Sequence, residues 1–282
     1  MAEANEGTPP AAPKLSIGMP VYNGGAFIDA ALTSLRQQTR GDFELIISDN
    51  ASSDDTPRII AHHAAQDPRL RVIRQTKNIG GIANFMAVLN AAEAPYFMWA
   101  ASDEMWSPDW VERLLPIAQS SHCMAFGRVQ MIEANGQPRP HAANGRNLSF
   151  TGPVFLRRMH YFLQPAFLGK ANPFYSIFPR DLLAGDALVP FQRGGQGADI
   201  LTLYQLLRCA KLVSVDGPRI YKRYHKASAA MTETARMRFR RTQLPDFLAL
   251  SSPAEKAALI VAFPMAAVQI PFRRIGSRLS LR

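Results

Sequence analysis

Short apolar runs alternate with segments of helical periodicity along the first third of the chain, and this order constrains the fold more than any other feature. The runs that predict buried strands are Leu15–Val21, Phe43–Ile47, Leu70–Ile73 and Tyr96–Trp99. The segments with helical spacing are Ala26–Gln38, Ser53–His63 and Gly80–Ala92. This alternation predicts an α/β fold with a mostly parallel sheet that helices cover on both faces.

Polar residues follow each of the four predicted strands. In chain order they are Tyr22-Asn23-Gly24, Asp49-Asn50, Asn78 and Asp103-Glu104. Ligands of parallel sheets bind beyond the carboxyl ends of the strands, so we expect these residues to converge on one site. The acidic pair after the fourth strand suits a divalent cation that neutralises a diphosphate.

These polar residues also have a plain structural interpretation. Asp103 and Glu104 suit a solvated turn before the next helix, where acids favour the helix dipole. Ser52 or Ser53 suits the N-cap of the helix that follows the second strand. Asp49 precedes that cap and ends a buried strand, which places it better to accept a hydrogen bond from a base or a ribose.

After Pro108 the pattern changes and predicts a smaller α+β portion. Its expected elements are a helix over Asp109–Ala118, strands over Ala125–Ile132, Leu212–Val215 and Arg219–Tyr224, and an Asn-Gly turn at 133–136. A glycine-rich loop, Arg193–Gly197, leads into Asp199 and a helix over Ile200–Cys209. Asp199 would either face the same cleft as a general base or cap this helix.

The positive charge of the chain is concentrated towards its C-terminal end. Residues 1–200 carry 17 Lys and Arg against 18 Asp and Glu, whereas residues 201–282 carry 15 against 4. The Arg-rich segments Arg236–Arg241 and Pro271–Arg282 flank the apolar run Ala257–Ile270, which is too short to span a bilayer. This region predicts either peripheral contact with an anionic membrane or a helical cap with a solvated cationic face.

Composition and cysteine usage exclude several classes of protein. A content of 47% hydrophobic and 19% charged residues excludes a disordered or fibrous chain. Cys123 and Cys209 lie far apart in the sequence, which argues against a zinc site or a disulfide scaffold and favours the cytoplasm. Residues 1–13 lack the apolar core of a signal peptide and are expected to be a flexible lead. No nucleic-acid partner is expected, because the basic residues form no recognisable binding module.

Several segments together carry a family resemblance. They are Ile17–Asn23, Ser34–Thr39, Leu45–Thr56, Asn78–Gly80 and Tyr96–Pro108, followed by Gly197–Asp199 and Tyr221–Ser228. In this order they resemble family 2 glycosyltransferases of the GT-A fold. The resemblance implies inverting transfer of a sugar from a nucleotide-diphosphate donor, with a divalent metal, Mn²⁺ or Mg²⁺, held by the acidic motif.

The resemblance gives nucleotide-binding roles to residues at the first three strand ends. Pro20, Tyr22 and Asn23 would line the nucleotide pocket together with the first loop. Asp49 would contact the base, and Asn78 would shape the pocket wall.

Metal binding and catalysis are implied for later segments. Asp103 would face the ribose or the metal, and Glu104 would face the metal and the diphosphate. His225 matches a family histidine near the diphosphate and metal, with the donor-binding Arg223 beside it. Asp199 matches the acidic residue that deprotonates the acceptor hydroxyl.

Two positions depart from the usual family pattern. Ala101 stands where many relatives carry Asp, which leaves Asp103 and Glu104 to hold the metal. Ala198 stands where many relatives carry Glu, so Asp199 is the sole carboxylate of that segment.

The predicted organisation has four parts. They are a lead over 1–13, a nucleotide-binding part over 14–108, an acceptor-side part over 109–232 and a basic amphipathic extension over 233–282. The expected function is sugar transfer to a glycan or lipid-linked acceptor in surface polysaccharide or glycolipid assembly, in the cytoplasm or at the inner membrane face.

Two other functions compete with this one. The altered acidic motif is compatible with a non-catalytic nucleotide-sugar-binding protein of the same fold. A nucleotidyltransferase is disfavoured, because such enzymes usually carry a basic phosphate loop after the first strand and Tyr22–Gly25 contains no basic residue.

Overall fold

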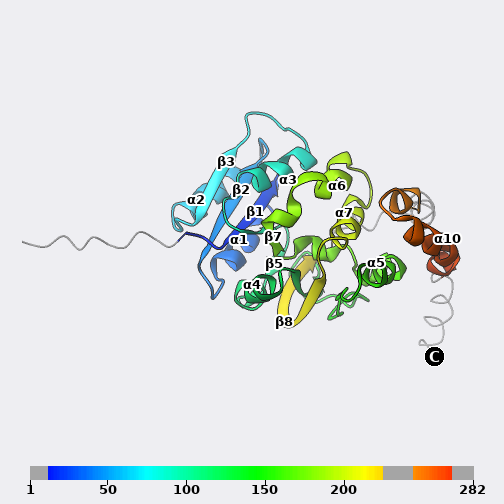
Figure 1. Cartoon of the computed structure of the whole chain (residues 1–282). Coiled ribbons are helices and arrows are strands. Elements are labelled where there is room, and N and C mark those ends of the chain that lie inside the picture. Colours follow the sequence, from blue (N-terminus) through cyan, green and yellow to red (C-terminus); the bar gives the residue numbers. More distant parts are fainter. Residues whose placement is uncertain (1–11, 225–243, 269–282) are drawn as a thin grey trace, which may run out of the picture.

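The computed structural model describes residues 12–224 and 244–268 of the chain (Figure 1). The main sheet consists of β1 (Leu15–Val21), β2 (Phe43–Asp49), β3 (Leu70–Arg74), β4 (Tyr96–Trp99) and β7 (Phe178–Pro179). The strand order is β3-β2-β1-β4-β7, and only the β4–β7 pair is antiparallel. All four predicted strands are confirmed. Strand β2 continues to Asp49 because it keeps its register with β1 as far as the Val21–Asp49 pair.

Helices cover both faces of this sheet, as predicted. They are α1 (Ile28–Arg36), α2 (Thr56–Ala64) and α3 (Gly81–Asn90). The chain passes from β1 through β2 to β3 in one direction and then returns past β1 to β4. With right-handed crossovers, α1 and α2 therefore lie on one face and α3 on the other. Helix α3 approaches β1 so closely that a Cβ added at Gly18 would lie 2.7 Å from Val88 Cγ2.

A second sheet, in the order β5-β8-β6, lies beyond the carboxyl end of β4. Its strands are β5 (Met105–Trp106), β6 (Met124–Ile132) and β8 (Leu212–Arg223), and α4 (Trp110–Ser121) packs against β6 and β8. Strand β5 was not predicted, and it forms because Met105 and Trp106 pair with Tyr221 and Ile220. The two strands predicted near the end of this portion are one strand, β8. The turn at 133–136 is confirmed, with the Gly136 N–H donating to the Glu133 carbonyl at 2.9 Å.

Residues 154–206, which include many aromatic side chains, fold mostly into short helices. They are α5 (Val154–Leu163), η1 (Ala166–Leu168), η2 (Asn172–Tyr175), η3 (Arg180–Leu183), η4 (Gly185–Leu188), α6 (Val189–Arg193) and α7 (Ala198–Leu206). Trp99, at the end of β4, stacks on Phe174 with ring centroids 4.7 Å apart, and Phe191 of α6 stacks on Phe174 at 4.9 Å. This aromatic cluster attaches the short helices to the face of the sheet that α3 covers.

The C-terminal described residues form a helix over 244–249 and α10 (Pro253–Val268), which packs against α5 (Figure 1). Helix α10 confirms the helical character of the apolar run and continues through Pro264. The Arg-rich segments Arg236–Arg241 and Pro271–Arg282 lie outside the described residues, as does His225, so the predictions made for them stay predictions. No helix in the described part of the chain has the length and apolar character needed to cross a bilayer.

Candidate active site

The sheet has a topological switch point between β1 and β4, where the chain order reverses. Ala100 N–H donates to the Gly18 carbonyl at 2.9 Å, so alternate residues of β1 face β4. The backbone of Pro20 therefore faces the space beyond the end of β4. No described strand pairs with it there, so the missing N–H of proline is tolerated. Crevices at such switch points are the usual ligand sites of open parallel sheets.

The loop after β1 is joined to the loop after β2 by reciprocal hydrogen bonds. Asn23 adopts a left-handed conformation with φ 49°, its N–H donates to Ser52 Oγ at 2.9 Å, and its Oδ1 accepts from the Ser53 N–H at 2.9 Å. Tyr22 projects outward with 52% of its surface exposed. Ser52 therefore fixes the first loop instead of capping α2, whose N-cap is Asp55. The structure places Tyr22 and Asn23 at the rim of the switch point.

Asp49 ends β2 with a buried carboxylate that is only partly satisfied. It is 1% exposed, and its Oδ1 accepts from the Ser52 N–H at 3.0 Å. Its Oδ2 has no hydrogen-bond partner among the described residues, and the nearest cation is Arg74 Nη1 at 3.7 Å. Burying an acceptor without a donor is costly. This oxygen is therefore suited to accept a hydrogen bond from a ligand.

Amide side chains connect the loops after β2 and β3. Asn50 Nδ2 donates to Asn78 Oδ1 at 3.0 Å, and Asn50 Oδ1 accepts from the Ile79 N–H at 2.8 Å. Asn84 of α3 donates to the Ser48 carbonyl at 2.9 Å and lies 2.6 Å from the Ser48 hydroxyl. Sequence reasoning placed Asn50 at this site without giving it a role of its own, and it gave no site role to Asn84. A polar residue on the sheet-facing side of an otherwise apolar helix was the available signal for Asn84.

The acidic motif after β4 is held by β8. Glu104 is 3% exposed, and its Oε1 accepts from Lys222 Nζ at 2.9 Å while its Oε2 accepts from the Arg223 N–H at 2.8 Å. Burial raises the pKa of Glu104, and the Lys222 charge opposes that rise. The pairing of β5 with β8 places Lys222 beside Glu104, so the unpredicted two-residue strand determines the geometry of the motif.

Arg223 is fixed by backbone carbonyls and an aromatic ring. It is 7% exposed, and its guanidinium donates to the carbonyls of Asp103 at 3.0 Å and Ala134 at 2.6 Å. The same group lies 4.5 Å from the centre of the Phe27 ring, which follows the β1 loop. Arg223 thus joins three loops around the switch point, and its predicted donor contact stays a prediction.

Metal ligands are scarce around this motif. Both oxygens of Glu104 already accept hydrogen bonds within the protein. Within residues 12–224 and 244–268, no three His, Cys, Asp or Glu side chains are grouped closely enough to hold a metal ion. The Asp103 carboxylate fits the requirement for a hard oxygen ligand, whereas Glu104 would have to lose existing partners to serve.

Asp199 lies in the first turn of α7, where Gly197, and not Asp199, occupies the N-cap. Its Oδ1 accepts from the Ile200 N–H at 2.8 Å, and burial raises its pKa while Lys222 lowers it. Tyr175, whose pKa burial raises to about 12, interacts electrostatically with Lys222, Glu104 and Asp199. The structure therefore brings the predicted base into the electrostatic environment of the acidic motif.

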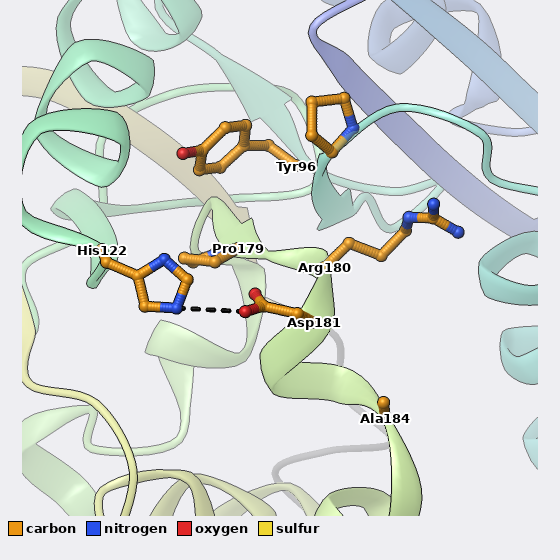
Figure 2. A pocket seen from close by; sticks show the side chains of 7 residues that line it. Tyr96, His122, Pro179, Arg180, Asp181 and Ala184 are labelled. Atoms are coloured by element: carbon orange, nitrogen blue, oxygen red, sulfur yellow. Dashed lines mark ion pairs between the residues drawn. The ribbon is translucent and has the colours of Figure 1, made fainter.

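A separate pocket lies on the side of the main sheet opposite to the switch-point loops (Figure 2). It lies at the amino end of β4, beside Tyr96 and Pro179, and is lined also by His122 and Asp181, which form an ion pair at 3.2 Å. Its lining contains none of the predicted site residues, so it is distinct from the switch-point site.

Comparison with known proteins identifies the family. Residues 16–181, which include all four switch-point loops, match the sequence profile of glycosyl transferase family 2. The chain belongs to glycosyl transferase family 2. The predicted family is therefore confirmed.

Two relatives illustrate the range of this family. Chondroitin synthase of Escherichia coli is 38% identical over 104 residues, which cover 36% of this chain and 15% of that protein. The GalNAc(5)-diNAcBac-PP-undecaprenol beta-1,3-glucosyltransferase of Campylobacter jejuni is 26% identical over 172 residues, which cover 61% of this chain and 53% of that enzyme. The chain thus spans less than two thirds of the length of either relative.

The solved structure of S. aureus TarS, residues 1–349, shares the fold. It superposes with a TM-score of 0.64 and 18% sequence identity, over 95% of this chain and 75% of that one. The predicted GT-A fold, with a mostly parallel central sheet flanked by helices, is therefore confirmed.

Proposed function

We propose that the chain is an inverting glycosyltransferase that moves a sugar from a nucleotide-diphosphate donor to an acceptor hydroxyl. The observation that carries the proposal is the position of Asp199, within electrostatic reach of Lys222, which itself donates to Glu104 at the switch point. A base and a cation that share one site are what a direct displacement at an anomeric carbon requires.

The donor side of the reaction belongs to the strand-end loops. Asp49 Oδ2, which has no hydrogen-bond donor among the described residues, accepts a hydrogen bond from the base or the ribose. Pro20, Tyr22 and Asn23 line the nucleotide pocket, and Asn78, held by Asn50, forms its wall. These loops are linked to one another by hydrogen bonds before the donor arrives, which lowers the entropic cost of binding.

The transfer step uses Asp199. The acceptor oxygen attacks the anomeric carbon from the face opposite the diphosphate, and the bond from that carbon to the phosphate oxygen breaks with its electron pair on the diphosphate. The acceptor proton passes to the Asp199 carboxylate. One base and one displacement give inversion, unlike the double displacement of retaining glycosidases.

A divalent metal, Mn²⁺ or Mg²⁺, supplies charge neutralisation of the leaving diphosphate when it is bound. Asp103 is the described residue that would hold it, with His225 as a further candidate from the sequence. Glu104 fits this role less well than the sequence predicted, because Lys222 and the Arg223 N–H use both of its oxygens.

The relatives suggest the donor and acceptor to try first. TarS has been crystallised with UDP and with UDP-GlcNAc. The Campylobacter enzyme is named for an acceptor linked to undecaprenol by a diphosphate. A UDP-sugar donor and a glycan or lipid-linked acceptor at the inner membrane face are therefore proposed. The proposed compartment is the cytoplasm, whose reducing conditions fit the free thiols of Cys123 and Cys209.

A thermal-shift panel of UDP-, GDP- and dTDP-sugars with Mn²⁺ tests donor binding, because a ligand that binds only the folded state raises the melting temperature. Donor turnover, measured with and without EDTA, then separates an enzyme from a non-catalytic nucleotide-sugar-binding protein. Binding without turnover on any acceptor would favour the latter, and a panel with no stabilising nucleotide would refute both.

A further inference from the structure

Lys222 is a cation that sequence analysis passed over. It lies in β8, one residue before Arg223, and its ε-ammonium is 2.9 Å from Glu104 Oε1. The same nitrogen is 4.9 Å from the centre of the Tyr175 ring, and 27% of its side chain is exposed. Lys222 is therefore held on two sides while part of its side chain remains exposed.

The described neighbours of Lys222 use only part of its hydrogen-bonding capacity. A lysine ammonium carries three N–H donors, and Glu104 accepts a hydrogen bond from one of them. The contact with the Tyr175 ring is a cation–π interaction and not a conventional hydrogen bond. Arg223, by contrast, is bound to backbone carbonyls on two loops. Arg223 therefore holds the loops together, whereas Lys222 has N–H donors that no described residue is shown to accept.

The charges around Lys222 place it between the two halves of the site. Glu104 and Asp103 follow β4 on the donor side, and Asp199 opens α7 on the acceptor side. All three carboxylates, together with Tyr175, interact electrostatically with this ammonium or with the ring beneath it. A diphosphate that leaves an anomeric carbon near Asp199 would develop its charge in this same space.

We propose that Lys222 binds the terminal phosphate of the nucleotide diphosphate and stabilises it as the bond to the sugar breaks, an inference that rests on the proposed function. The electron pair of that bond stays on the phosphate oxygen, and Lys222 donates a hydrogen bond without giving up its proton. Glu104 is then a positioning residue that holds the ammonium in place. This fixed cation acts whether or not a metal is bound beside Asp103.

Calorimetric binding of UDP, GDP and dTDP, each compared with its nucleoside monophosphate, tests the proposal with Mn²⁺ and again with EDTA. Lys222→Met is expected to weaken binding of the preferred diphosphate by about 10- to 100-fold, the usual effect of losing a charged hydrogen bond, and to leave monophosphate binding nearly unchanged. Lys222→Arg should recover most of the loss. Lys211 directly precedes β8, at the end of the strand opposite to Lys222. Lys211→Met is the matched control and should change neither affinity.

A purely structural role for Lys222 makes a different prediction. Lys222→Met leaves Glu104 buried without its counter-ion, which lowers the melting temperature. The double variant E104Q/K222M removes that unpaired charge, and we expect it to recover the melting temperature but not the diphosphate affinity. Recovery of both would overturn the proposal, as would equal losses for diphosphate and monophosphate. Failure of the wild-type protein to bind any of the three diphosphates would refute the proposed function itself.

Discussion

Asp199 combines two properties that a general base for an alcohol needs. Burial raises the pKa of its carboxyl, so the carboxylate is a stronger base than an exposed aspartate. Lys222 opposes this rise and keeps the charged form accessible. The same burial means that the ionised side chain destabilises the folded state, because the carboxylate has lost part of its hydration.

Asp199→Asn is expected to lower kcat by about 10²–10⁴, the usual contribution of a general base. Donor affinity should persist, since the donor contacts lie on the strand-end loops. The folded protein binds the Asp199 proton more tightly than the unfolded chain does, so stability falls as pH rises from the ordinary aspartate pKa through the raised one. The variant should therefore melt at a higher temperature than wild type at neutral pH. Near-wild-type kcat would remove Asp199 from the mechanism.

The pH dependence of kcat should carry the same signature. Transfer requires ionised Asp199, so kcat is expected to rise with pH through an acid limb whose midpoint lies above the ordinary aspartate pKa. Burial also raises the pKa of Glu104. Protonation of Glu104 would release Lys222 and would therefore also lower kcat at low pH. The limb measured for Glu104→Gln tells the two apart, because a limb due to Asp199 survives that substitution. An acid limb at the ordinary aspartate value would contradict this assignment.

Sequence reasoning found the residues of the switch point but not their partners. Asp49, Asn78 and Asp103 were predicted because each follows a strand whose apolar pattern is visible in the sequence. Lys222 and Tyr175 were missed because their place beside Glu104 depends on contacts between segments far apart in the chain. Local patterns carry no information about such contacts.

At the scale of elements, the same distinction separates the two sheets. The four parallel strands are short apolar runs joined by helices, and each was predicted within two residues of its observed bounds. Strand β5 has two residues and exists only because β8 pairs with it, so its own sequence carries no strand signal. Strand β8 was divided in two because Asp216, Gly217 and Pro218 interrupt its pattern, and Gly217 adopts φ 107° there.

A buried ion pair joins α10 to α5. Arg158 is 1% exposed and donates to both oxygens of Glu255, at 2.7 and 2.6 Å, and its Nη2 donates to the Leu250 carbonyl at 2.7 Å. Its guanidinium also stacks 3.9 Å from the ring of Tyr204 in α7. Burial opposes ionisation of Glu255, but hydrogen bonds from Ser252 and the Arg158 charge lower its pKa.

Glu255→Leu is expected to destabilise the protein by about 3–5 kcal/mol, because it leaves Arg158 buried without a counter-ion. The double variant R158M/E255L should recover much of that loss, since two apolar residues can replace a buried pair. The Glu255 contribution is present above the ordinary glutamate pKa and is lost as pH falls through the lowered one. Denaturant unfolding measures each value.

A matched control for this pair is Arg58→Met, which breaks an ion pair whose two side chains are 74% and 70% exposed. It should cost no more than about 1 kcal/mol. A loss for Glu255→Leu no larger than that of the control would show that α10 is not held by this pair.

At the scale of the whole molecule, the part of the sequence that carries most of the positive charge also contains exposed apolar side chains. Residues 201–282 hold 15 Lys and Arg against 4 Asp and Glu. In α10, Ile260 is 58% and Val261 78% exposed, and Leu156 of the adjoining α5 is 59% exposed. Figure 1 places these helices at the end of the molecule opposite to β3 and α2. Exposed apolar side chains within a basic part of the sequence are typical of segments that contact anionic lipid.

The last prediction concerns this surface as a membrane contact. The full chain is expected to sediment with vesicles that contain phosphatidylglycerol, to bind far less to phosphatidylcholine vesicles, and to be released by salt, because each basic residue near the surface contributes about 1 kcal/mol. Substituting Ile260 or Val261 with Ser should weaken binding roughly tenfold each, since each loses the burial of an apolar side chain. Val72→Ser, in β3 and 42% exposed, is the control at the far end and should change nothing. If the Ile260 and Val261 variants bind these vesicles as well as wild type does, α10 does not contact the membrane. The region would then be a helical cap with a solvated cationic face.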